Sequence, residues 1–454
     1  MSDGQLISER PVGRIALGSA AAFLTYGVGA GLSYIAQLVI ARIVGATSYG
    51  VYAYVFAWMT VLAYLAALGF DVSLLRLISG YRAQHSWGLV RGVIEYSQRC
   101  VLIAGISVMI VGTGIVLSVN PPLELKYTFL AGLLLVPVWA LLWIRAAVVR
   151  AFGGVVSALA PDRLVRDGVL LAFIGVISLN HQWPINAPLA MLATLASSVI
   201  GLALVSAAVY RRRPADVRAV APEFAAKLWR KTALPLVLIA VAETAMNRTG
   251  VVVFGWMGLA KEAGVFALVF NVTALALLPR MAVNSLFAPM VSELYVKRNH
   301  AGLQELITKA ALWTLIGSAG IALPVMLLAE PLLSWFGPEF VAGAGALRIM
   351  MIGQVIAAAA GSPLFLLTMT GHERAAAAIF ISGVIGSVAL AIPLINILGL
   401  IGAAVASTSI LLMWNAAMVA FIRLRLSLDP GVLAALPRPS AWLAGGNNLH
   451  FRRR

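Results

Sequence analysis

The chain has 454 residues, of which 61% are hydrophobic and 11% are charged, and its mean hydropathy is +0.95. Soluble domains carry about 45–50% apolar and about 25% charged residues, so this composition excludes a soluble enzyme, a disordered tail and a secreted disulfide scaffold. We expect an all-α integral membrane protein, and the length leaves room for about twelve transmembrane helices.

Apolar segments of spanning length recur along the chain. We expect membrane helices at 18–41, 48–70, 93–118, 127–149, 168–180, 187–209, 232–257, 263–288, 306–329, 342–368, 375–396 and 398–422. The fifth follows a polar lead-in in which Asp162, Arg163, Arg166 and Asp167 are expected to form a solvated ion-pair cluster. The resulting organisation is a cytoplasmic N-terminus 1–17, a first lobe 18–210, a basic cytoplasmic linker 211–231, a second lobe 232–425 and a cytoplasmic C-terminal tail 426–454.

The basic residues are distributed unevenly between the two sides of the predicted membrane. Of the 33 Lys and Arg residues, 25 fall on the side of the N-terminus, three on the opposite side and five within spans. The positive-inside rule then makes both termini cytoplasmic, and the start of the chain has no signal-peptide cleavage pattern. The net charge of +16 is therefore mainly a topology signal and an attraction to membrane lipids, and it calls for no nucleic-acid partner.

The two predicted lobes contain similar segments at the start of their second helices. The segment YGVYAYVFAWMTVLA (49–63) aligns with AGVFALVFNVTALAL (263–277), and each follows a tight turn with a glycine. Two like-oriented six-helix sets imply a pseudo-two-fold axis along the membrane normal, as in alternating-access transporters. A channel, a receptor or an intramembrane enzyme are the alternatives. The alignment pairs Gly50 with Gly264, Val51 with Val265, Ala53 with Ala267, Val55 with Val269 and Phe56 with Phe270, and the turn glycines are Gly45 and Gly258.

Motifs of enzymes are missing from the sequence. There is no G-x-x-x-x-G-K-[ST] nucleotide-binding motif, and the five histidines have no metal-ligand spacing. We therefore expect a transporter with no metal site and no cofactor, coupled to an H⁺ or Na⁺ gradient.

Charged residues within membrane spans are costly and are candidates for functional sites. Arg248 lies about 16 residues into the seventh span, too far from either surface for easy snorkelling. Glu243 and Asn247 precede it closely. Either Glu243 and Arg248 neutralise each other, or they face a wet cavity.

Other spans contribute further candidate residues for substrate binding. Arg280 shares a helix face with Asn284, and Tyr26 shares a face of the first span with Gln37, where a helix–helix interface is the alternative role. Arg145 lies near the cytoplasmic end of the fourth span, where snorkelling explains it equally well. The predicted cavity is thus weighted toward arginine, which suits phosphate, diphosphate or carboxylate, so we expect an anionic substrate.

Three stretches of the sequence resemble polysaccharide biosynthesis membrane proteins of the O-antigen flippase type. They are LVIARIVGATSYGVYAYVFAWMTVLAYLAALGFDVSLLRLISGY (38–81), GVFALVFNVTALALLPRMAVNSLFAPMVSELY (264–295) and FGPEFVAGAGALRIMMIGQVIAAAAGSPLFLLTMTGHERAAA (336–377). The resemblance implies the multidrug/oligosaccharidyl-lipid/polysaccharide (MOP) superfamily and a V-shaped pair of six-helix lobes. It also implies translocation of undecaprenyl-diphosphate-linked oligosaccharide across the bacterial inner membrane by alternating access, for exopolysaccharide, lipopolysaccharide or O-antigen assembly.

The same resemblance assigns roles to particular positions. It implies that the first and seventh helices face the cavity, and that Asp71 and Arg76 of the G-Φ-D-V-S-L-L-R segment lie at the cytoplasmic gate. Relatives often carry an acid where Asn247 and Arg248 stand here, which leaves the coupling ion open. The implied partners are an anionic lipid-linked oligosaccharide and the polysaccharide polymerase machinery. The alternatives are a MATE-like small-molecule or ion antiporter and a membrane-embedded glycan polymerase or ligase, for which the chain lacks a sizeable outer loop.

Overall fold

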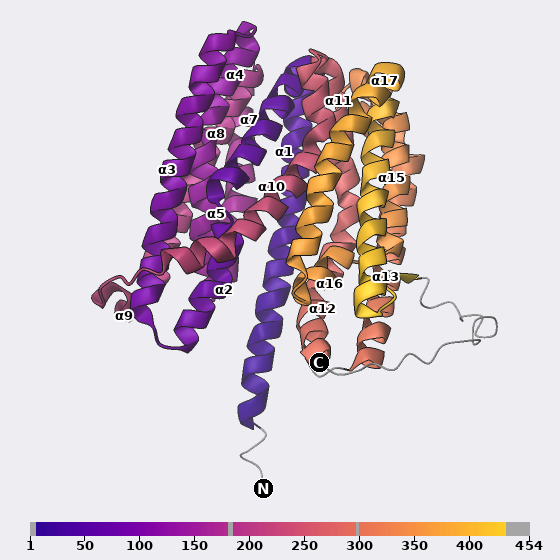
Figure 1. Cartoon of the computed structure of the whole chain (residues 1–454). Coiled ribbons are helices and arrows are strands. Elements are labelled where there is room, and N and C mark those ends of the chain that lie inside the picture. Colours follow the sequence, from indigo (N-terminus) through magenta and orange to yellow (C-terminus); the bar gives the residue numbers. More distant parts are fainter. Residues whose placement is uncertain (1–5, 180–184, 297–298, 433–454) are drawn as a thin grey trace, which may run out of the picture.

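The computed structural model describes residues 6–179, 185–296 and 299–432, which are nearly all helical and contain no β-strand. This confirms the predicted all-α class (Figure 1). The N-half comprises α1 (Leu6–Ala67), α2 (Phe70–Ala83), α3 (Trp87–Val119), α4 (Leu123–Leu133), α5 (Leu135–Ala151), α6 (Val155–Ala160), η1 (Pro161–Val165), α7 (Arg166–Leu179), α8 (Ala187–Arg212) and α9 (Ala215–Ala219). The C-half comprises α10 (Ala226–Trp256), α11 (Ala260–Thr273), η2 (Ala274–Leu277), α12 (Leu278–Val296), α13 (His300–Leu327), α14 (Ala329–Ser334), η3 (Pro338–Gly343), α15 (Ala344–Ala359), α16 (Pro363–Met369) and α17 (Glu373–Leu426).

Nine helices of the described residues are long and apolar enough to cross a membrane. Two of these segments, Gly27–Ala83 with 57 residues and Glu373–Leu426 with 54, far exceed the roughly 20 residues of one crossing. They contain non-helical glycines, Gly45 (φ 76°) in α1 and Gly399 (φ 56°) in α17, and Figure 1 shows that both helices fold back along themselves. The total of twelve crossings stays a prediction, which these two folded-back helices support.

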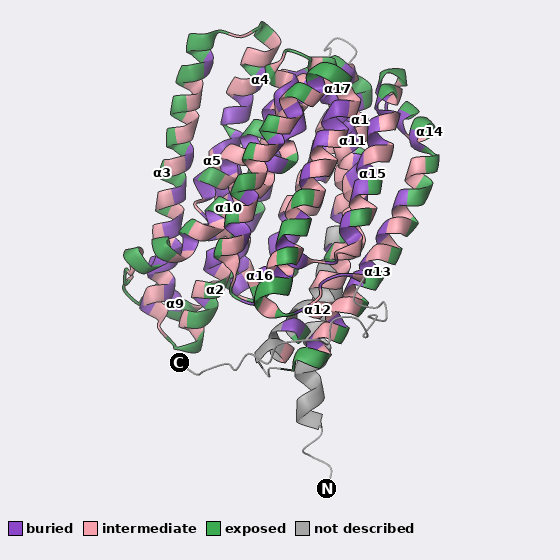
Figure 2. Ribbon diagram, turned by 45° about the vertical axis from the view of Figure 1, so that its right-hand side comes forward, coloured by how far each residue is buried: buried purple, intermediate pink, exposed green. Residues whose placement is uncertain are grey.

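The outer faces of the helices are apolar. Ile103 and Ile110 on α3 expose 66% and 62% of their area, and Ile385 on α17 exposes 70%. Figure 2 shows such exposed positions along the outward faces of α3, α13 and α17, while buried residues lie where helices meet. Large aliphatic side chains so exposed would be unfavourable in water, so these faces fit contact with lipid. The chain is a multi-pass membrane protein.

Proline and glycine break spans that the sequence predicts as continuous. Within 263–288, the 3₁₀ turn η2 precedes Pro279, and within 342–368 the helix stops at Gly361 (φ 72°) before Pro363 starts α16. Proline lacks an N–H donor and its ring collides with the preceding turn, so a helix ends or deforms there. The polar segment before the fifth predicted span lies outside that span in the sequence-based prediction, but in the structure it is helical from Val155 onward.

Helix α10 connects the two halves. It starts beside α2 and α3 of the N-half and ends among α1, α11 and α17 (Figure 1). At its start Trp229 is buried and its indole N–H donates to the hydroxyl of Tyr81, 2.9 Å away. Gly69 (φ 74°) makes room for it, because a Cβ atom there would lie 2.3 Å from the carbonyl oxygen of Ala233. The seventh predicted span therefore begins against the first lobe.

The two halves approach most closely through the equivalent glycines of the repeat. A Cβ atom on Gly50 of α1 would lie 1.7 Å from the carbonyl oxygen of Ala260, and one on Gly264 of α11 would lie 2.2 Å from that of Ala46. The same Cβ atoms would lie 2.8 and 2.9 Å from the backbone nitrogen of the opposite glycine. Mutual contact between equivalent residues is what a two-fold relation produces. The repeat predicted from sequence thus meets itself at this crossing.

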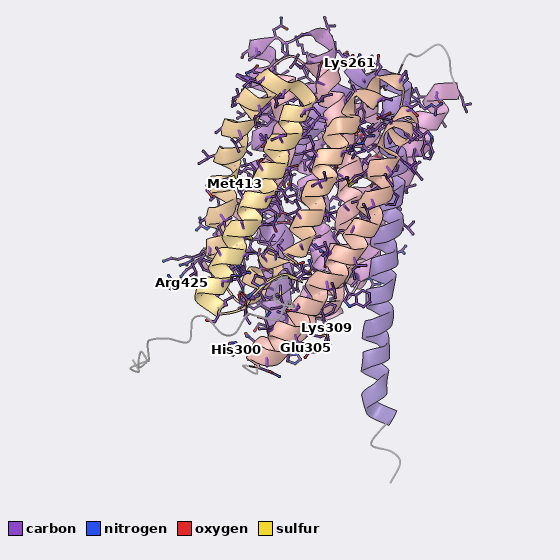
Figure 3. All side chains as sticks on the ribbon, turned by 90° about the vertical axis from the view of Figure 1, so that its right-hand side faces the viewer. Lys261, His300, Glu305, Lys309, Met413 and Arg425 are labelled. Atoms are coloured by element: carbon purple, nitrogen blue, oxygen red, sulfur yellow. The ribbon has the colours of Figure 1, made fainter. Side chains whose placement is uncertain are left out.

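This glycine crossing lies toward the distal end of the bundle, defined as the end opposite the start of α1, where the chain turns at Gly45, Gly258 and Gly399. There the carboxylate of Glu339 in η3 accepts a hydrogen bond from the backbone N–H of Ala46, and the two atoms are 3.2 Å apart. Ala46 starts the second arm of α1, which is the part that follows Gly45, and the N-terminal end of a helix carries partial positive charge. Figure 3 places Lys261 at this end and His300, Lys309 and Arg425 toward the opposite end. That separation agrees with the two sides predicted from charge.

We predict that a methyl group at the glycine crossing separates the distal ends of the two halves. Gly264→Ala forces a Cβ atom into backbone, and such overpacking costs about 1–3 kcal/mol. Spin labels at Thr47→Cys and Lys261→Cys in a Cys100→Ser background measure the distance between the halves, and we expect a longer, broader distribution in Gly264→Ala. The control is Gly320→Ala on α13, where a Cβ atom meets nothing within 4 Å. Identical distributions in the two alanine variants would contradict the prediction.

Candidate functional site

Arg248 of α10 lies between aromatic rings from both halves. Its guanidinium carbon is 5.9 Å from the ring centroid of Phe56 on α1 and 5.5 Å from that of Phe270 on α11. These distances fit cation–π attraction, which strengthens when the cation is desolvated. Phe56 and Phe270 are equivalent residues of the repeat, so Arg248 lies near the pseudo-symmetry axis. We call these three residues the arginine clamp.

No ion pair or hydrogen bond joins Arg248 to Glu243 in the described part of the chain. The helix explains this, because residues five apart are rotated by roughly 140° at about 100° per residue. Side chains three or four apart face each other, and those five apart do not. Of the two alternatives that the sequence leaves open, mutual neutralisation of Glu243 and Arg248 is therefore not the one observed.

A hydrogen-bonded chain next to the arginine clamp uses one predicted cavity residue. The buried hydroxyl of Tyr49 donates to Oε1 of Gln37, at 2.8 Å, and accepts from Nδ2 of Asn271, at 3.3 Å. Gln37 and Tyr49 belong to α1, whereas Asn271 follows Phe270 on α11. Gln37 thus lies at the junction of the halves, and its role in substrate binding stays a prediction. The side chain of Tyr26 lies outside the residues whose side chains the structure describes.

A second charged cluster is buried in the N-half. Arg166 pairs with Asp162, at 2.8 Å, and with Asp167, at 3.0 Å, and Asp167 also accepts a hydrogen bond from the hydroxyl of Ser33. Only 4% of Asp167 is exposed, so the expectation of a solvated cluster is wrong. The i,i+4 spacing of Asp162 and Arg166 indicates the pair. Asp167 is buried where α7 packs against α1, which carries Ser33, 134 residues away in sequence.

Arg280 lies at a different depth from Arg248. It is ten residues beyond Phe270 on the same α11–α12 rod, or roughly 15 Å further along at 1.5 Å per residue. Its Nε atom is buried and has no hydrogen-bond partner among the described residues. Asn284, one turn further, lines a pocket with Phe287 of α12 and Leu306 of α13. Arg248 and Arg280 therefore provide cations at two different depths in the bundle.

The remaining predicted residues lie apart from the arginine clamp. The guanidinium of Arg145 on α5 donates to the hydroxyl of Ser206 on α8, within the N-half. Arg76 is exposed, and the carbonyl of Asp71 accepts a 3.4 Å hydrogen bond from Arg150. Asp71 and Arg76 both lie on α2, the helix that contacts α10. Their gate role stays a prediction, as does the substrate role of Arg145.

Asn247 and Arg248 are neighbours on α10 with different surroundings. Asn247 lines a pocket inside the C-half, together with residues of α11, α15 and α17. Phe270 lines the same pocket, and its ring centroid lies 5.5 Å from the guanidinium carbon of Arg248. Within the described residues no three His, Cys, Asp or Glu side chains lie close enough to hold a metal ion.

The profile of a family described as polysaccharide biosynthesis proteins matches residues 16–161. No curated protein matches the chain. Among solved structures, the inward-facing conformation of a multidrug resistance MATE family transporter of the MOP superfamily is 16% identical and has a TM-score of 0.67, covering 87% of this chain and 98% of its own.

Two further structures show the same similarity. The outward-facing conformation of such a MATE family transporter is 16% identical, with a TM-score of 0.65 and coverage of 90% of this chain and 95% of its own. A MOP superfamily transporter from Pyrococcus furiosus is 14% identical, with a TM-score of 0.61 and coverage of 90% and 95%. The chain carries the sequence pattern of the polysaccharide biosynthesis family over residues 16–161 and the fold of MOP superfamily transporters over most of its length.

Proposed function

We propose that this protein is an alternating-access flippase that moves undecaprenyl-diphosphate-linked oligosaccharide across the bacterial inner membrane. The family match over residues 16–161 and the transporter fold support the class. The charge distribution supports an inner-membrane protein with both termini in the cytoplasm. The proposed setting is exopolysaccharide, lipopolysaccharide or O-antigen assembly, in which a polymerase would take up the delivered units.

The observation that carries the proposal is Arg248, a cation within a membrane span with no acidic partner in the described residues. An unpaired charge in this environment is costly and is retained for function. Its aromatic neighbours compensate part of that cost. Guanidinium binds phosphate oxygens through two parallel hydrogen bonds, so a diphosphate is the group that best matches it.

The arginine clamp supplies a way to couple binding to motion. One ring comes from each half, so separating the halves at the glycine crossing would remove at least one cation–π contact from Arg248. The freed guanidinium then faces the space between the halves, where a diphosphate can replace the lost ring. Arg280, roughly 15 Å further along, provides a second cation on the path toward the proposed cytoplasmic side.

The polarity of the interior supports an anionic substrate. Asp162 and Asp167 are both paired with Arg166, which leaves few carboxylates to attract a cation. For the Pyrococcus furiosus transporter, reverse polarity of the binding pocket suggests a different function. In the proposed flippase, the arginine-weighted interior likewise favours an anionic substrate over a cationic one.

One observation favours a MATE-like antiporter as a second candidate. Glu243 of α10 forms no ion pair with a described residue, and a lone carboxylate can bind a proton or a sodium ion. In the flippase the same residue would serve the coupling gradient rather than the substrate. The two functions therefore differ in the role of Arg248, which would bind a diphosphate in the flippase and has no such role in the antiporter.

We predict that Arg248→Ala abolishes most surface polysaccharide while the protein still reaches the membrane. In the bound complex Arg248 would pair with the substrate diphosphate, and truncating one partner of such a buried charge pair costs about 2–5 kcal/mol. We therefore expect at least a tenfold loss of lipid-linked oligosaccharide transport in proteoliposomes. Arg248→Lys should restore only part of it, because the ammonium lacks the planar fork. The matched control is Arg99→Ala on α3, whose side chain is 73% exposed. Normal polysaccharide in Arg248→Ala at normal protein levels would refute the site.

We predict that Glu243→Gln keeps substrate binding and loses gradient-driven transport, because glutamine cannot exchange a proton or hold sodium by charge. Binding is measured on the purified full chain, and transport in proteoliposomes under an imposed pH gradient or an imposed Na⁺ gradient. The control is Glu373→Gln in the first turn of α17. Full gradient-driven transport by Glu243→Gln would exclude coupling through this carboxylate.

A further inference from the structure

The pocket lined by Asn247 lies inside the C-half and is polar without being charged. It lies between α10, α11, α15 and α17. None of the residues that line it is ionisable at neutral pH. We call it the C-half polar pocket. A bound ion of either sign would find no counter-charge there.

Two oxygen atoms in the wall of this pocket lack hydrogen-bond donors. Oε1 of Gln354 on α15 and Oγ1 of Thr408 on α17 are buried and unpartnered in the described residues. Their helices are in close contact, since a Cβ atom on Gly353 would lie 2.5 Å from the methyl carbon of Thr408. Buried polar atoms without partners are destabilising. Both oxygens accept hydrogen bonds, so a ligand with hydroxyl donors would satisfy them.

The rest of the lining suits a sugar ring. Phe270 and Trp414 add aromatic surface, against which the C–H face of a sugar can pack. Thr249 and Ser387 also line the pocket, and their hydroxyls lie 2.9 Å apart. Aromatic faces, neutral amides and hydroxyls together complement a ring that is apolar on one face and hydroxylated at its edge.

The pocket adjoins the arginine clamp through one shared ring. Phe270 lines the pocket and lies 5.5 Å, centroid to guanidinium carbon, from Arg248. An anionic group at Arg248 and a neutral ring in the pocket would therefore both lie next to Phe270. In a lipid-linked oligosaccharide the diphosphate and the first sugar are likewise joined directly.

We propose that the C-half polar pocket binds an uncharged, hydroxylated sugar ring, namely the sugar attached to the diphosphate that Arg248 holds. This subsite rests on the proposed flippase function. Gln354 and Thr408 accept hydrogen bonds from the sugar hydroxyls, and Asn247 contributes an amide beside Arg248. The pocket thus binds the sugar, and the arginine clamp binds the charged diphosphate.

Isothermal titration of the full chain in nanodiscs tests this with two probes. One is citronellyl diphosphate, and the other is the same lipid diphosphate linked to glucose or to N-acetylglucosamine. We expect the linked sugar to tighten binding about tenfold or more, which corresponds to one or two buried hydrogen bonds. Combining Thr408→Val with Gln354→Leu should reduce this sugar-dependent gain to within about twofold while leaving citronellyl diphosphate binding unchanged.

Controls separate this proposal from the flippase function. Arg248→Ala should weaken both probes alike, and Thr408→Ser, which keeps the hydroxyl, should retain the gain. Thr314→Val on α13, a buried threonine bonded to its own helix, should also retain it. If the wild-type chain binds both probes equally, or the gain survives in the double variant, the sugar pocket is wrong and the flippase stands. If neither probe binds, both proposals fail.

Discussion

The close approach of Gly50 to Gly264 is the constraint on which the rest of the structure depends. Any larger residue would place a side-chain atom within about 2 Å of the opposite backbone, so α1 and α11 cross this closely only because both positions lack a Cβ atom. The crossing brings Glu339 to the N-terminal end of the second arm of α1. It also sets Phe56 and Phe270, six residues further along their helices, on either side of Arg248.

That geometry explains how a cation persists inside the membrane without an acidic partner. A carboxylate would neutralise Arg248 in every conformation, and it would compete with any anionic substrate. Aromatic rings stabilise the charge less strongly than a carboxylate would. Because one ring comes from each half, the stabilisation of Arg248 depends on the distance between the halves. Under the proposed function, Arg248 is masked when the rings close on it and available when they part.

The sequence predicts the helical class and the repeat, because these follow from composition and local spacing. It also places Arg248 deep within a span, and the role of Arg248 in substrate binding stays a prediction. The equivalence of Gly50 with Gly264 appears in the alignment, and their contact follows from symmetry. The burial of Asp167 could not be predicted, since it depends on the packing of α7 against α1 and α8, which are distant in sequence. Helical spacing separates the faces of Asn247 and Arg248, but only the packing of α15 and α17 shows that one side is a pocket.

Under the proposed function, the placement of charge also constrains how a lipid-linked substrate would travel. Arg248 and Arg280 lie at depths that differ by roughly 15 Å, so one diphosphate cannot bind both at once, and it would pass from one to the other. Each site is a single cation without a fixed acidic partner among the described residues, so neither needs to break a salt bridge before binding. Release from Arg248 is then favoured by the return of the phenylalanine rings, which replace the departing anion. The same closure of the halves that ends access from one side would thus expel the substrate toward the other.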